Sequence, residues 1–204
     1  MSLQMSTRSD LRVEPGRPGP IPSTLSAHLC IDFVNSEFAE HRNGVITYDR
    51  LAMPEWRRWF LARCGLPGTT RIDAGLRSEA VRLRTLLRDL LSRRRPPSES
   101  ELAALNRQLR KAVLDRRVAR RDRTIEFTSA WRPSGWPAAL AALVLSYVEL
   151  VSRGRMDRVR VCANPSCTYM FVDDSRNGRR RWCDPGVCGN LMHVRFFRLR
   201  RGAR

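Results

Sequence analysis

The sequence predicts a mainly α-helical protein of the α+β class. A helical N-terminal domain with a short β-hairpin precedes a small C-terminal module that combines a ribbon with a helix. Two observations predict this division. Apolar residues recur at helical spacing through most of residues 23–152, and four of the six cysteines form two close pairs after residue 160. We therefore divide the chain into an N-terminal arm (1–22), a helical domain (23–152) and a C-terminal module (153–204).

The composition is that of an ordinary soluble globular protein, with 42% hydrophobic and 28% charged residues among 204. The sequence contains no apolar run long enough to predict a membrane span. Its first residues lack the continuous apolar core of a secretory signal, which predicts a cytoplasmic location. Four prolines between residues 15 and 22 indicate a disordered arm.

Positive charge dominates the chain, which carries a formal net charge of +18 and has Lys111 as its only lysine. Residues 151–204 hold 13 Arg against 4 Asp, a net charge of +9 in about a quarter of the length. This concentration favours a polyanionic partner such as nucleic acid.

The helical domain begins with an ambiguous element, because the apolar segment from His28 to Asn35 fits either a buried helical turn or a strand. Residues 54–64 are predicted to be a helix, since Pro54 suits its first turn and Gly65 follows its end. Residues 74–93 show the strongest helical pattern. One apolar face of that helix is made by Leu76, Ala80, Leu83, Leu87 and Leu90.

Ser98 with Glu101 forms a capping box that predicts the start of the next helix. Residues 123–131 alternate between polar and apolar and predict a strand that pairs with 114–120 in a hairpin. An apolar helix is expected over 138–151. The helix that follows Ser98 is expected to bury a face made by Leu102, Leu105, Leu109 and Val113.

Four cysteines form two pairs with the same internal spacing, Cys162 with Cys167 and Cys183 with Cys188. Two close cysteine pairs separated by a loop supply the four thiolates of a tetrahedral zinc site. The sequence therefore predicts a four-cysteine zinc-ribbon-plus-helix module with one structural zinc ion. The alternatives are two disulfides in an exported domain or a redox sensor that uses the same thiolates.

The residues around the cysteines support a ribbon, with strands predicted at 158–161 and 169–172. Trp182 is expected to pack on the metal site, and His193 to lie on the surface. A helix is predicted after Cys188 up to about Arg201. Its apolar face, expected to pack on the ribbon, comprises Val187, Leu191, Val194 and Phe197.

Arginines fill the polar loop between the cysteine pairs and most of the final helix. A guanidinium group can contact phosphate through two hydrogen bonds, so these residues are candidates for nucleic-acid contacts. Asn190, next to the last cysteine, is expected either to contact a base or to cap the helix. The candidate contacts are Arg176, Arg179, Arg180, Arg181, Asn190, Arg195, Arg198, Arg200 and Arg201.

About 45 residues of the module resemble the CGNR-type zinc finger. The matching motifs are Cys162-x4-Cys167, Phe171-Val-Asp, Ser175-Arg-Asn, Arg180-Arg-Trp-Cys183 and Cys188-Gly-Asn190, followed by a basic helix. Leu191 stands where the family motif ends in Arg. The preceding domain resembles the ABATE domain through Asp32-Phe-Val-Asn35 and the order of its helices.

The resemblance implies a stress-related bacterial transcription regulator, located in the cytoplasm at the nucleoid. Its finger would bind DNA, and its N-terminal domain would sense a small-molecule ligand or form a homodimer. RNA binding and a protein-interaction finger remain alternatives. The chain lacks a nucleotide-binding glycine loop, a metalloprotease motif or a Ser/His/Asp set, so no enzymatic activity, catalytic residue or organic cofactor is expected.

The remaining chemically active residues have simpler interpretations. Cys30 and Cys64 are expected to be buried structural thiols. His28 is interpreted as a core histidine and Asp32 as a helix cap. The aromatic residues of the helical domain are expected to fill its core rather than line a pocket, among them Trp56, Trp59, Phe60 and Tyr147.

Overall fold

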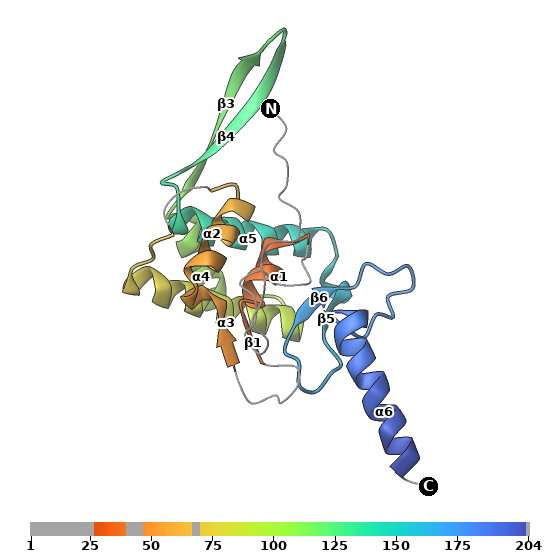
Figure 1. Ribbon diagram of the computed structural model, residues 1–204. Coiled ribbons are helices and arrows are strands. Elements are labelled where there is room, and N and C mark those ends of the chain that lie inside the picture. The colour runs from red at the N-terminus through yellow and green to blue at the C-terminus, as the bar shows by residue number, and fades with distance from the viewer. Residues whose placement is uncertain (1–26, 40–46, 67–69, 203–204) are drawn as a thin grey trace.

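The computed structural model describes residues 27–39, 47–66 and 70–202, and the predicted arm at 1–22 lies outside these residues. The described chain contains a helical body from which two elements project, a β-hairpin at one end and the C-terminal helix at the other (Figure 1). Its elements confirm the predicted α+β class. Among the described residues, no helix is long and apolar enough to cross a membrane.

Five helices form the body. Their bounds are α1 (Leu29–Val34), α2 (Pro54–Arg63), α3 (Ala74–Arg93), α4 (Glu99–Leu109) and α5 (Trp136–Ser152). The ambiguous segment at 28–35 is therefore helical. A small antiparallel hairpin, β1 (Glu37–Ala39) with β2 (Thr47–Asp49), follows α1 and leads into the short 3-10 helix η1 (Arg50–Ala52). The short hairpin was not predicted.

Helix α5 forms the centre of the core, since nearly every side chain from Trp136 to Val144 is buried. Trp56 stacks on Phe60 with ring centroids 4.8 Å apart, and Phe33 packs on the same ring at 5.4 Å. The aromatic residues thus fill the core, as predicted, instead of lining a pocket. Burying several aromatic rings supplies a large part of the apolar area that stabilises a domain of this size.

Helices α3 and α4 follow the sequence closely at their starts. The predicted capping box is present, with the Ser98 hydroxyl accepting from the Glu101 backbone and the Glu101 carboxylate accepting from the Ser98 backbone. The predicted apolar face of α4 is confirmed only in part: Leu105 is buried and Leu109 packs on the core, but Leu102 is 38% exposed, and Val113 belongs to a strand and is 66% exposed. The chain leaves the helix before the apolar spacing ends.

Asp32 and His28 differ from their predicted roles. The Asp32 carboxylate is buried and accepts a hydrogen bond from Arg63 Nε at 2.8 Å, so it joins α1 to α2 and is not a helix cap. His28 occupies the position before α1 and is only half-buried. Burial lowers the pKa of its imidazole.

The predicted hairpin is present as β3 (Val113–Arg121) and β4 (Thr124–Arg132), which pair in antiparallel register along their whole length. It projects from the helical body (Figure 1). The tip residue Asp122 has a φ of +52°, a left-handed conformation that Asp tolerates better than most residues.

The C-terminal module begins with the 3-10 helix η2 (Met156–Arg158) and a ribbon of β5 (Val159–Val161) paired with β6 (Met170–Val172). A π-helical turn, η3 (Pro185–Gly189), then leads into α6 (Asn190–Gly202). Helix α6 extends away from the ribbon (Figure 1). The prediction that its apolar face packs on the ribbon is wrong, because Val187, Val194 and Phe197 are 45%, 40% and 58% exposed. Met192 is buried instead.

The ribbon does not form a core of its own. Val159, Met170 and Val172 belong to the same buried cluster as the residues of α1, α3 and α5. The side chain of Asn35 also joins the two parts: its Nδ2 donates to the Met170 carbonyl at 2.7 Å, and its Oδ1 accepts from the Met170 amide at 2.8 Å. The helical domain and the module are therefore packed as one structure.

Candidate metal centre and nucleic-acid interface

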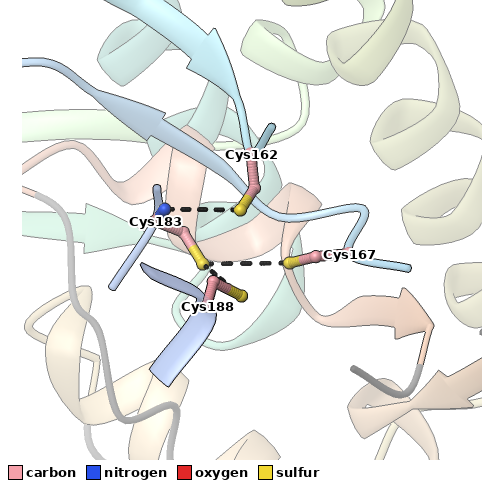
Figure 2. A group of neighbouring side chains, drawn as sticks. All are labelled: Cys162, Cys167, Cys183 and Cys188. Carbon is pink, nitrogen blue, oxygen red and sulfur yellow. Dashed lines mark hydrogen bonds between the residues drawn. The ribbon is translucent and has the colours of Figure 1, made fainter. Parts of the chain in front are cut away.

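The four cysteines of the two pairs converge in space. Figure 2 shows their side chains meeting from two segments of the module, and their sulfur atoms all lie within 4.8 Å of one another. Cys183 Sγ is 3.8 Å from Cys167 Sγ and 3.6 Å from Cys188 Sγ. These separations are far longer than the roughly 2.05 Å of a disulfide bond, so the disulfide alternative does not describe this site.

The same separations fit zinc. Four sulfurs at about 2.3 Å from a tetrahedrally coordinated zinc ion lie roughly 3.8 Å from one another. All four cysteines are buried, and nearby amides point at their sulfurs: the Cys183 amide lies 3.5 Å from Cys162 Sγ, and Asn164 Nδ2 lies 3.5 Å from Cys188 Sγ. Such donors stabilise thiolates and orient them. The four cysteines bind one structural zinc ion.

The thiols also need a cation for electrostatic reasons. A hydrogen bond with Cys167 lowers the pKa of the Cys162 thiol to about 6. Hydrogen bonds with Cys162 raise the pKa of Cys167 and of Cys183 far above the usual range of a thiol. Without a metal, only part of the set can ionise, because each new thiolate repels the first. A divalent cation removes this conflict.

The metal site rests on an aromatic cluster to which the helical domain contributes. Phe38 from β1 lies edge-on to Tyr169 with ring centroids 5.5 Å apart, and both pack in one buried cluster with the four cysteines. Trp182 packs against this cluster, as predicted. An added Cβ at Gly189 would lie 3.0 Å from the Trp182 ring, so a larger residue there would force the indole to move by a few tenths of an ångström.

The arginine-rich loop has a fixed shape because a buried carboxylate organises it. Asp173 is 0% exposed, and its side chain accepts from the Ser175 amide at 3.0 Å, the Ser175 hydroxyl at 2.5 Å and the Arg180 amide at 3.0 Å. Burial raises the pKa of Asp173, but these hydrogen bonds outweigh that effect and lower it overall. These hydrogen bonds preorganise the loop, so binding of a partner would cost little conformational entropy there.

Arg180 differs from the other loop arginines. Its Nε donates to the Trp182 carbonyl at 2.8 Å, its Nη2 contacts the Cys183 carbonyl, and its guanidinium lies 4.7 Å from the centre of the Phe171 ring. These contacts direct it toward the finger's own backbone. We therefore expect Arg180 to support the metal site, and we leave it out of the proposed binding surface.

The other candidate arginines face solvent or lie near it. Arg176, Arg179 and Arg181 are exposed on the loop, and α6 carries no acidic side chain. Trp182 connects the two regions, since it ends the loop and lies against Gly189, the last residue of η3 before α6. We call this set the finger arginines: Arg176, Arg179, Arg181, Arg195, Arg198, Arg200 and Arg201.

Asn190 does not cap the final helix. It has helical φ and ψ angles of −59° and −45°, and the cap of the preceding turn is Asp184. The Asp184 carboxylate accepts from the Gly186 amide at 2.8 Å and from the Val187 amide at 3.2 Å. Asn190 is exposed at the start of α6, the helix that carries four of the finger arginines. His193 is exposed, as predicted.

The other two cysteines lie outside the metal site, and the predicted burial is confirmed for Cys30 only. Cys30 is buried, and Cys64 is half-buried at the end of α2. Burial raises the pKa of each thiol to about 12, which makes both poor nucleophiles at neutral pH.

Asn164 was predicted as a turn residue of the first cysteine pair, but the contacts of Asn35 and Asp173 were not predicted from the sequence. All three are buried polar side chains next to the finger. Asn164 stands two residues after the ligand Cys162, a position where Asn favours a turn. In the structure its Oδ1 accepts a hydrogen bond from the Ser166 amide at 3.1 Å. Asn35 carried no local signal for its partner, which lies 135 residues away.

Comparison with known families agrees with this architecture. Residues 27–154 match the ABATE family, described as "Putative stress-induced transcription regulator", and residues 158–201 match the CGNR zinc finger family. The first match covers more than half of the chain, and the two matches lie in the predicted order. No curated protein matches the sequence.

Proposed function

This chain belongs to the ABATE family, and from that premise we propose that it is a transcription regulator that binds DNA through its C-terminal zinc finger. The observation that carries the proposal is the basic surface of the finger arginines. It is mounted on a preordered loop and on a helix that projects from the body. Arginines in such positions contact phosphates, and one or two can contact guanine edges in the major groove.

The proposal includes no enzymatic role. Four thiolates complete the coordination of a structural zinc ion and leave no open position for a substrate or an activated water. A regulator of this kind would act in the bacterial cytoplasm, at the nucleoid. The zinc folds the module, and the arginines provide the affinity.

The test is a fluorescence anisotropy titration of the full chain with duplex DNA over a series of salt concentrations. Replacing Arg176, Arg179 and Arg181 by Gln is expected to weaken binding by at least tenfold at physiological salt. The slope of log K against log salt should become shallower by about 2.7, because each lost phosphate contact removes roughly 0.9.

The matched control replaces three exposed arginines of the helical domain, Arg58, Arg93 and Arg110, by Gln. It removes the same charge and should change the slope by less than half as much. Arg180→Ala should instead lower the unfolding temperature, since it leaves finger carbonyls without their donor. An equal loss of DNA affinity in both triple variants would show that only the net charge of the protein matters. Tighter binding of RNA than of DNA would favour the RNA alternative.

The proposal assigns ligand sensing to the helical domain. Support comes from a groove of about 320 Å³ between α3 and α4, lined by Leu83, Leu86 and Ala104 together with Arg82, Arg107 and an ion pair of Lys111 with Glu79. Within the described residues, the buried Oε1 of Gln108 in this groove has no hydrogen-bond partner. The volume lies within the range of small-molecule sites, and Arg82 and Arg107 beside the two leucines suit an anion with an apolar body.

Octanoate serves as a probe of this groove. It is expected to raise the unfolding temperature by several degrees at concentrations far above its dissociation constant. The cationic analogue octylamine should have no such effect, and Ala104→Phe, which fills the groove, should abolish the response to octanoate. An equal response in the filled variant would place the binding elsewhere. A homodimer found by light scattering would instead support the dimerisation role of this domain.

A further inference from the structure

The β3–β4 hairpin stands apart from the helical body (Figure 1). Its register runs from the pair Val113–Arg132 to the pair Arg121–Thr124, nine paired positions in all. At roughly 3.4 Å per residue, the hairpin is about 30 Å long. A two-stranded hairpin without a third strand or a helix against it is only marginally stable in water, so its exposed faces call for an explanation.

One face of the hairpin combines arginines with exposed apolar side chains. Residues directly opposite each other share a face, which places Val118 with Phe127 and Arg120 with Ile125. Val118, Ile125 and Phe127 are 65%, 76% and 82% exposed. We call this the arginine–aromatic face: Arg116, Val118, Arg120, Ile125 and Phe127.

The opposite face neutralises most of its own charge, since its three arginines pair with two acidic side chains. The Asp115 carboxylate lies 3.0 Å from Arg117 Nε and 3.4 Å from Arg132 Nε, and Arg121 lies 3.5 Å from Glu126. Across the part of the chain that the structure describes, neither Arg116 nor Arg120 is within ion-pair distance of an acidic side chain. Arg116 and Arg120, which have no such partner among these residues, thus lie on the same side of the hairpin as the exposed Val118, Ile125 and Phe127.

This pairing of features selects among possible partners. A second copy of the chain would bring Arg116 and Arg120 against like charges, which opposes face-to-face association. A polyanion complements them. A two-stranded ribbon fits the major groove of B-form DNA, about 12 Å wide, whereas the deep, narrow major groove of A-form RNA excludes such an element.

We propose that the arginine–aromatic face of the hairpin is a second DNA-binding surface, separate from the zinc finger. Arg116 and Arg120 contact phosphates, while Phe127, Ile125 and Val118 pack on sugars and on thymine methyl groups within the groove. The hairpin and α6 project from opposite ends of the molecule (Figure 1), so the two surfaces contact DNA at separate places. The proposal rests on the proposed function, because it extends DNA binding by the finger.

The test compares two variants of the full chain that carry equal charge changes on the same strand. Arg116→Gln with Arg120→Gln alters the arginine–aromatic face, and Arg117→Gln with Arg121→Gln alters the neutralised face. The first variant is expected to weaken binding of a 30-base-pair duplex by about tenfold and to make the salt slope shallower by about 1.8. The second should have less than half that effect. Phe127→Ser should weaken binding without changing the slope.

Each outcome separates the hairpin from the finger. If the wild-type protein shows no salt-sensitive binding to DNA, the proposed function itself fails. If the wild-type protein binds but both hairpin variants match it, or match each other, only the hairpin proposal is overturned. A change of oligomeric state in the Arg116/Arg120 variant, measured by light scattering, would also overturn it and identify the face as a contact between copies. Circular dichroism should show that both variants keep the fold.

Discussion

Replacing Cys188 by Ser is expected to remove zinc from the protein and to weaken DNA binding by more than a hundredfold. The four sulfurs lie within 4.8 Å of one another and are the centre of the small cluster that supports the finger. Zinc contributes about 10–16 kcal/mol to the folding of comparable small finger peptides, far more than this cluster could supply through apolar burial. Without it, the finger arginines lose their common framework.

Three measurements check this expectation: zinc per chain by elemental analysis, DNA affinity, and far-ultraviolet circular dichroism. Zinc should fall from one ion per chain to none, while most of the helical signal remains because α1 to α5 hold the main core. Cys64→Ser is the control, since Cys64 lies outside the cluster and should keep both zinc and affinity. Full DNA affinity in the zinc-free protein would contradict the role given to the finger.

Replacing Asn35 by Ala is expected to lower the free energy of unfolding by about 2–6 kcal/mol. The substitution leaves both the amide and the carbonyl of Met170 buried without partners, at about 1–3 kcal/mol for each group. Because the same contact fixes the ribbon on α1, the loss should affect the whole chain. Two observables report it, the urea midpoint and the cooperativity of the transition.

Asn106→Ala is the matched control, because Asn106 is exposed on α4 and the substitution should change stability by less than about 0.5 kcal/mol. In the wild type, a helical signal and a finger signal such as Trp182 fluorescence should change at the same urea concentration. Two separate transitions would show that the finger and the helical domain are independent, and the Asn35 contact would then be incidental.

The elements that the sequence predicted correctly are those with local signals. The leucine spacing of α3, the capping box at Ser98 and the cysteine pairs each depend on residues a few positions apart. The hydrogen bonds of a capping turn and the two ligands of a close cysteine pair both depend on residues that are near one another in the sequence. The metal ligands were therefore predicted completely from spacing and residue type.

The elements that escaped prediction depend on distant partners. The Asn35 contact joins residues 135 positions apart, and Phe38 reaches the metal cluster from a hairpin with no strong pattern of its own. For helix α6, a local pattern was present but the contact predicted from it does not form. Its apolar spacing predicted packing on the ribbon, whereas the structure leaves Phe197 and Val194 exposed. Spacing shows that a helix has an apolar face, not what covers it.

The shared core has a consequence for the synthesis of the protein. Met170 is made 135 residues after Asn35, which at roughly 5–20 residues per second is on the order of ten seconds of translation. During that interval, the nascent helical domain exposes the surface that the ribbon later covers, and proteases and chaperones act on such surfaces. Metal capture then completes the fold. The abundance of the protein should consequently follow the zinc supply of the cell.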